Sequence, residues 1–143
     1  MNWLVNLFQS VVFQTVISGV LVFVLSQYIL KFIIEPLQEY KKIIAKIDNK
    51  LKFYANIISN PGILPRDVIL ECSDEIRSLS CELEQIYKQI PFAFLRRLIK
   101  SQQLISDSAS RLIRLSNSLY QGDALRNDED IRKIRENLNI PEL

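Results

Sequence analysis

Apolar residues fill the first part of the chain without a charged interruption. No Asp, Glu, Lys or Arg occurs within residues 1–30, and the stretch VVFQTVISGVLVFVLSQYIL over residues 11–30 is almost wholly apolar. A helix of this length, rising about 1.5 Å per residue, spans about 30 Å, the thickness of a bilayer's hydrocarbon core. The pattern predicts a transmembrane anchor helix and junction over residues 1–36.

Beyond the anchor, apolar positions repeat at spacings of three and four, the heptad pattern of helices that pack side by side. The first seam comprises Leu37, Tyr40, Ile44, Ile47, Leu51, Tyr54 and Ile58. The second seam, which follows Pro65, comprises Ile69, Cys72, Ile76, Leu79, Leu83, Ile86 and Ile90. A turn signal over residues 59–62 separates these two predicted helices.

Two further helices are expected in the remainder. One is predicted from Phe92 to Tyr120, closed by Gly122, and a short last helix from Asp128 to Leu138, capped by Asn127. Residues one heptad apart along the longer helix are Leu98, Ile105, Leu112 and Leu119. The acidic residues 128–130 suit the positive end of the last helix. The predicted fold is therefore all-α, with one N-terminal transmembrane helix followed by an antiparallel helical bundle of three to four helices in residues 37–143.

Charge changes this picture in two ways. The first and third predicted helices are net basic and the second and last are net acidic, which favours packing between neighbours. Lys31, Lys41, Lys42 and Lys46 follow the span and no Lys or Arg precedes it, so the positive-inside rule places the C-terminal domain in the cytoplasm. The start also lacks a basic residue, and the apolar run is too long for a secretory signal, so an uncleaved anchor is expected.

The span carries a few small and polar residues. Thr15, Gly19 and Ser26 share a narrow face that lets another helix approach closely, and Gln14 and Ser18 lie on a neighbouring face. They are either tolerated in a single span or mark self-association around a polar axis. Trp3 and Tyr28 lie near the two ends, where aromatic rings favour the membrane interface.

The soluble part contains no set of residues that indicates catalysis. Histidine is absent, which removes the commonest general base and metal ligand, and the net charge of +2 disfavours nucleic acid as a partner. No cofactor or metal is expected. Cys72 and Cys81 lie on opposite faces of one predicted helix and are interpreted as buried free thiols.

Two groups of polar residues are candidates for binding. The basic group comprises Arg96, Arg97, Lys100, Arg111 and Arg114. It forms a solvated face that matches the acidic second helix, or contacts anionic lipid near the membrane. The alternative is a nucleotide or RNA site, which would suit a hydrolase or nuclease. Asn56 is expected to pair with Ser116 or Asn117, either as a hydrogen-bonded clip between the first and third helices or as a ligand-facing cluster.

Several short segments also carry a resemblance. They are Ile34-Glu35-Pro36, Phe53-Tyr54-Ala55-Asn56, Asn60-Pro61-Gly62 and Leu115-Ser116-Asn117-Ser118-Leu119. With the hydrophobic N-terminal helix, this layout resembles small, mostly uncharacterised bacterial membrane proteins over nearly the whole chain. It is also similar to the small membrane protein that accompanies RNA-targeting type VI-B CRISPR effectors. That family's soluble part is compared with helical ribonuclease domains, whose Arg–His motif cannot occur in a chain without histidine.

The resemblance implies a ring-like membrane pore that boosts antiviral defence, in the bacterial inner membrane. The sequence therefore predicts a non-enzymatic, single-pass membrane protein, with its N-terminus outside, that self-associates as a ring or pore. The alternative is a membrane-anchored scaffold or adaptor whose helical bundle binds a cytosolic protein partner. The expected partners are membrane lipid, further copies of the chain and a cytosolic protein.

Overall fold

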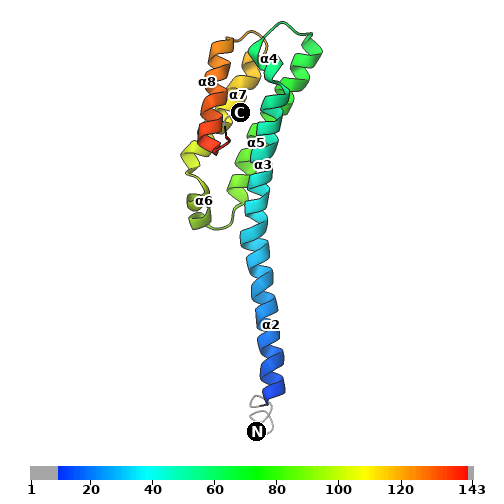
Figure 1. The fold of residues 1–143 in the computed structure, drawn as a ribbon, viewed down its shortest axis with the longest axis vertical. Coiled ribbons are helices and arrows are strands. Elements are labelled where there is room, and N and C mark those ends of the chain that lie inside the picture. The colour runs from blue at the N-terminus through cyan, green and yellow to red at the C-terminus, as the bar shows by residue number, and fades with distance from the viewer. Residues whose placement is uncertain (1–9, 142–143) are drawn as a thin grey trace. The chain divides into compact units, whose positions relative to one another are not determined.

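The structure is a computed structural model that describes residues 10–141, so the predicted interfacial role of Trp3 lies outside the described residues. Within that range the chain is helical and forms no strand, which confirms the all-α class (Figure 1). The chain divides into two compact units, residues 1–35 and 36–143. Each unit is described separately below.

The first unit contains α2 (Val11–Ile29) and a π-helical turn, η1 (Leu30–Ile34). Ser10 caps α2, because its side-chain oxygen accepts a hydrogen bond from the backbone N–H of Phe13 at 3.1 Å. None of the described residues of α2 and η1 is buried. The helical stretch Val11–Phe53 includes an 18-residue window of mean hydropathy 2.0, so one helix is long and apolar enough to cross a membrane.

The second unit is built from the helices that follow. Their bounds are α3 (Glu35–Phe53), α4 (Ala55–Ser59), α5 (Arg66–Gln89), α6 (Ala93–Ile99), α7 (Gln102–Ser118) and α8 (Ala124–Leu138). Pro36 lies in the first turn of α3, where its missing N–H is tolerated. In the interior of the unit, α7 packs against both α5 and α8, and α4 contacts α8.

The core follows the two predicted seams with local shifts. Between Tyr40 and Ile47 of α3 the buried residue is Ile43, whereas the predicted Ile44 is half-buried. In α5 Tyr87 is buried, whereas the predicted Ile86 is half-buried. The other seam residues of α5 are buried as predicted, namely Ile69, Cys72, Ile76, Leu79, Leu83 and Ile90. The helical period is therefore correct, and the register differs by one residue at two places.

The predicted helix from Phe92 to Tyr120 is wrong as a single element. Lys100 is extended, with φ −162° and ψ 157°, and separates α6 from α7. Ser101 then caps α7, since its side chain accepts a hydrogen bond from the N–H of Leu104. Because the chain leaves the helix here, Leu98 does not continue the seam of α7 and is 81% exposed.

The start of the last helix also differs from the prediction. α8 begins at Ala124 and its cap is Asp123, whose side chain accepts a hydrogen bond from the N–H of Leu125 at 3.0 Å. Asn127, the predicted cap, is instead buried within α8 and is 1% exposed. The predicted cap at Asn127 is therefore wrong, and Asp123 supplies the same capping chemistry one turn earlier.

Gly62 connects the loop after α4 to the end of α7. Its N–H donates to the carbonyl of Leu119 at 2.9 Å, and its φ of +77° is a conformation that glycine adopts readily. A Cβ at this position would lie 2.9 Å from the carbonyl oxygen of Tyr120. The predicted turn at residues 59–62 is therefore present and also ties two distant segments together.

Candidate functional site

The predicted self-association face of α2 is exposed in the described chain. The hydroxyl of Thr15 donates to the carbonyl of Val11 at 2.8 Å, and that of Ser26 donates to the carbonyl of Val22 at 2.7 Å. Both donors are therefore satisfied inside their own helix. A Cβ built on Gly19 would meet no described atom within 4 Å. These three residues thus form a small, weakly polar surface.

Gln14 and Ser18, on the neighbouring face, are exposed as well. An amide and a hydroxyl on the surface of an apolar helix favour a partner or water over lipid. The structure therefore places all five predicted span residues on the surface of α2.

The five predicted basic residues do not form one cluster. Arg96 and Arg97 lie on α6, and Lys100 follows it in the extended linker, where its Nζ donates to Oδ1 of Asn139 at 2.8 Å. Arg111 and Arg114 lie on α7 and point toward α8. The break between α6 and α7 therefore separates the group into two parts with different surroundings.

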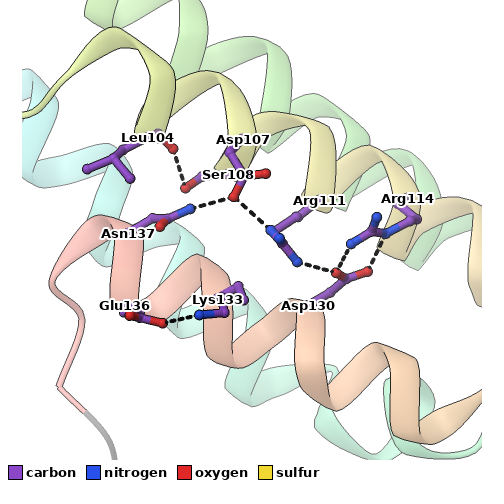
Figure 2. Close-up of polar contacts among 9 residues, drawn as sticks. All are labelled: Leu104, Asp107, Ser108, Arg111, Arg114, Asp130, Lys133, Glu136 and Asn137. Carbon is purple, nitrogen blue, oxygen red and sulfur yellow. Dashed lines mark hydrogen bonds and ion pairs between the residues drawn. The ribbon is translucent and has the colours of Figure 1, made fainter.

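Asp130 of α8 binds both arginines of α7 (Figure 2). Its carboxylate accepts a hydrogen bond from Nη1 of Arg111 at 2.9 Å and one from Nε of Arg114 at 2.6 Å, and Nη2 of Arg114 also contacts it. The Asp130 side chain is 2% exposed. Charge-assisted hydrogen bonds of this kind are stronger than those between neutral groups. This cluster was missed from the sequence, which assigned Asp130 to the positive end of a helix.

Asp107 extends the cluster on the solvent side (Figure 2). It accepts a hydrogen bond from Nε of Arg111 and another from Nδ2 of Asn137, each at 2.8 Å. The Arg111 guanidinium holds the pKa of the Asp107 carboxyl below its usual range, and burial opposes this shift only partly. Asp107 and Asp130 also raise the pKa of Arg111.

This cluster fits a structural role better than catalysis or anion binding. Both carboxylates accept hydrogen bonds from arginine, so neither is free to act as a general acid or base. Arg111 and Arg114 donate guanidinium N–H groups to the carboxylates of Asp107 and Asp130 in the same chain. In the described part of the chain, no group of three or more His, Cys, Asp or Glu residues could hold a metal ion.

The predicted clip between Asn56 and the end of the third helix is not formed. Asn56 accepts a hydrogen bond from Asn60 at 3.1 Å, the hydroxyl of Ser116 donates to the carbonyl of Ile113, and Asn117 accepts from Arg77. Asn56 and Asn117 are exposed, whereas Ser116 is buried within α7. The expected pair belongs to surfaces that do not meet.

Asn127 forms the clip that the sequence placed elsewhere. Its Nδ2 donates to the carbonyl of Ile58 at 2.8 Å, and its Oδ1 accepts from the hydroxyl of Ser118 at 2.5 Å. The side chain thereby ties α8 to α4 and to the end of α7. An Asn close to a predicted helix start is typical of a cap, so the sequence did not indicate that Asn127 is buried and joins three segments.

Ion pairs link α3 to α5, as the opposite charges of the two helices predicted. Nζ of Lys50 lies 2.5 Å from Oε2 of Glu75, which also accepts from the hydroxyl of Tyr54 at 2.6 Å. Lys46 pairs with Glu82 at 2.6 Å. The Lys50 ammonium and the Tyr54 hydroxyl hold the pKa of Glu75 below its usual value, while burial and the bond to Glu75 raise the pKa of Tyr54.

The two cysteines differ in exposure. Cys72 is buried as predicted, and burial raises the pKa of its thiol to about 12. Cys81 is exposed, so the prediction of a buried thiol is wrong for this residue. Its position on α5 falls on the opposite face from Cys72, and that face is turned outward.

A groove of about 370 Å³ lies where α3, the end of α6 and the end of α8 meet. Its lining comprises Leu37, Tyr40, Lys41, Ile44, Ile99, Lys100, Leu138 and Asn139. Tyr40 is 5% exposed, and its hydroxyl has no hydrogen-bond partner among the described residues. Burial raises the pKa of this hydroxyl to about 12, so it is a neutral donor. Buried hydroxyls normally have a partner, so this groove differs from the rest of the interior.

The described chain therefore offers an exposed apolar helix, an internal ionic cluster and a groove with an unpaired hydroxyl. Comparison with known protein families, with curated proteins and with solved structures finds no match for the chain.

Proposed function

We propose that this chain is a single-pass membrane protein that acts without catalysis, by assembling with further copies of itself in the membrane. The observation that carries the proposal is α2, an uncharged helix none of whose residues is buried in the protein. An apolar surface of this size needs cover from lipid or from other helices. The basic residues that follow the helix favour an orientation with residues 36–143 on the cytoplasmic side of a bacterial inner membrane.

The small face of α2 supports self-association. Between helices in lipid, close van der Waals packing of small residues is a main source of affinity, because apolar burial alone gains nothing there. Thr15 and Ser26 already bond to their own carbonyls, and Gly19 leaves open space for a neighbouring backbone. Gln14 and Ser18 are then expected to meet across the interface or to border a wet axis.

The soluble unit is proposed to be an antiparallel bundle that assembles beneath the spans. A ring or pore that acts in antiviral defence is the form that the resemblance to the CRISPR-associated membrane protein suggests. The ion pairs of Arg111 and Arg114 support a role without catalysis, because these arginines stabilise the fold of the unit.

The mass of the full-length protein in mild detergent tests the proposal. We expect an oligomer for the wild type and a smaller species for Gly19→Leu, which fills the close-approach position. Val24→Leu is the control, because it places the same side chain about 140° around the helix from Gly19. A monomeric wild type, or an oligomer that Gly19→Leu leaves intact, would refute self-association through this face.

A second candidate is a membrane-anchored adaptor that binds a cytosolic protein. It is favoured by an open groove of about 530 Å³ over α5 and α7, where Cys81 is exposed and Ile113 is 41% exposed. Ile113→Lys would then release one stoichiometric soluble partner from the purified protein while the oligomer mass of the chain itself stays unchanged. An adaptor with no oligomer would leave Gly19→Leu without effect.

A further inference from the structure

The short helix α6 exposes most of its apolar surface. Leu95 is its buried residue, whereas Phe94 is 63% and Leu98 is 81% exposed. The ring of Phe92 stacks on that of Phe94 with centroids 5.6 Å apart. These side chains therefore form an outward-facing apolar patch that the second unit does not cover.

Basic residues accompany this patch. Arg96 lies in α6 and is half-buried, Arg97 is exposed, and Lys100 follows directly. A short segment that combines exposed aromatic and leucine side chains with arginines is typical of helices that lie in the membrane interface. The apolar side chains enter the acyl boundary, and the cations meet acidic headgroups.

The groove beside α6 has the same mixed chemistry. Lys41 and Lys100 line it as cations, and Tyr40, whose buried hydroxyl is unpaired, is part of its wall. Apolar side chains complete the lining, namely Leu37, Ile44, Ile99 and Leu138. Cations with a neutral donor suit a phosphate, and the apolar lining suits the start of an acyl chain.

Along the chain, the residues that line this groove begin close to the apolar run. The apolar run ends at Leu30, and Leu37 follows seven residues later, a separation that a helix covers in about 10 Å. Within the second unit, α6 lies at the end opposite to α4 (Figure 1). The groove and α6 therefore belong to the end of the unit that leaves the membrane first along the chain.

We propose that α6 and the Tyr40 groove form a second membrane contact, which binds an anionic phospholipid of the bilayer that holds α2. The phosphate lies between Lys41 and Lys100, where the Tyr40 hydroxyl can donate to it, and the exposed side chains of α6 insert beside it. The proposal rests on the membrane anchoring proposed above and adds the class of lipid and its site. This contact would hold the second unit against the membrane surface.

Quenching of a single tryptophan tests the insertion of α6. Full-length Trp3→Phe/Phe94→Trp is reconstituted in vesicles of phosphatidylcholine brominated on its acyl chains, with and without phosphatidylglycerol. The control is Trp3→Phe/Ile63→Trp, because Ile63 is 75% exposed in the loop between α4 and α5. Figure 1 shows α4 at the end of the unit opposite to α6. We expect strong quenching at position 94, greater with phosphatidylglycerol, and little at position 63. Equal quenching at the two positions in both compositions would overturn the proposal.

The outcome also separates this proposal from the anchoring itself. A protein that fails to incorporate into vesicles refutes the membrane span. A protein that incorporates but shows no specific quenching at position 94 leaves the span intact and refutes the second contact. Quenching at position 94 that appears only on dilution of the protein in the vesicles would indicate that a second copy covers α6 in the assembled protein, which also refutes the lipid contact.

Thermal stabilisation of the full-length protein in neutral detergent tests the groove. We expect short-chain phosphatidylglycerol to raise the unfolding temperature, and Lys41→Gln/Lys100→Gln to weaken this apparent affinity about 30-fold, which equals about 1 kcal/mol for each charge. Lys88→Gln/Lys133→Gln is the control, since both lysines are exposed or half-exposed and pair locally on other helices. An unchanged affinity in Lys41→Gln/Lys100→Gln would refute the groove as the site.

Two further measurements in the same assay identify the ligand of the groove and test the Tyr40 hydroxyl as a hydrogen-bond donor. Glycerol phosphate without an acyl chain should not stabilise the protein, and equal stabilisation by it would assign the groove to a free phosphate. Tyr40→Phe should lose part of the lipid-induced shift without lowering the stability of the lipid-free protein, because the hydroxyl it removes has no partner there. A loss of lipid-free stability would instead mean that the hydroxyl already has a structural partner.

Discussion

Replacing Asp130 with Asn should destabilise the soluble unit strongly, since one buried carboxylate neutralises two arginines. Asp130 accepts hydrogen bonds from both guanidinium groups, and its side chain is 2% exposed. Asn keeps the shape but loses the charge and one acceptor oxygen. Its amide N–H groups would also face the N–H groups of Arg111 and Arg114. The variant therefore disrupts the bonds of Asp130 between α7 and α8 without creating a cavity.

The size of this effect follows from the exposure of the partners. Breaking a buried ion pair costs about 3–5 kcal/mol when the remaining charge stays buried. Here the Arg114 side chain is 43% exposed and can hydrate, and Arg111 keeps its bond to Asp107. We therefore expect a loss of about 2–3 kcal/mol in the free energy of unfolding, which is about 10–15 °C for a domain of about 100 residues.

Thermal unfolding of the full-length protein in mild detergent, followed by circular dichroism at 222 nm, measures this loss. Asp107→Asn is the matched control, because the Asp107 side chain is 44% exposed and Arg111 would keep its bond to Asp130. This control should lose less than about 1 kcal/mol, as exposed ion pairs usually do. If Asp130→Asn unfolds within a degree or two of the wild type, the cluster does not join α7 to α8 in solution.

Three further predictions follow from the other contacts of the soluble unit. Asn127→Ala should destabilise the protein by about 2 kcal/mol in the same thermal assay, because it leaves the Ile58 carbonyl unpaired and buried; no change would show that water replaces the amide. The pKa of Glu75 is lowered from its usual 4.5, so its stabilising effect is complete above that pH and is lost as the pH falls through the lowered value. The unfolding temperature of Glu75→Gln should therefore fall less between pH 5 and pH 3 than that of the wild type, because the variant lacks this one titrating carboxyl. A maleimide at pH 7 should label Cys81 and leave Cys72 unmodified in the native protein, as mass spectrometry of the labelled chain would measure; rapid labelling of Cys72 would contradict its burial.

The helical class and the two long seams could be predicted because a three-four repeat depends on burial of one helix face alone. The repeat does not determine the register where two apolar residues are adjacent. Ile43 and Ile44 both satisfy the spacing from Tyr40 to Ile47, and in the folded unit Ile43 is the one that is buried. Tyr87 is buried in place of Ile86 for the same reason, since its hydroxyl can also reach the carbonyl of Lys100 at 2.9 Å.

The pairing of polar residues could not be predicted in the same way. Asn56 and Asn117 were matched because both reduce helix propensity, but propensity carries no information on which faces meet. Asn127 was assigned to a cap because it precedes an acidic run. Its buried bond to the carbonyl of Ile58 joins residues 69 positions apart, and only the arrangement of α4 and α8 brings them together.

The break at Lys100 decides what the basic residues do. Leu98 and Ile105 are one heptad apart, so the apolar repeat runs through residues 100 and 101 as if the helix continued. Ser101 is compatible with a helix interior but is more favourable as a cap, and the cap prevails here. As a result, α7 directs Arg111 and Arg114 to a carboxylate of α8, while α6 is free to expose its own apolar and basic side chains. One continuous helix would have placed Lys100, Arg111 and Arg114 along one side, whereas the broken one separates the two arginines, which bind a carboxylate of α8, from the three cations of α6 and the linker that follows it.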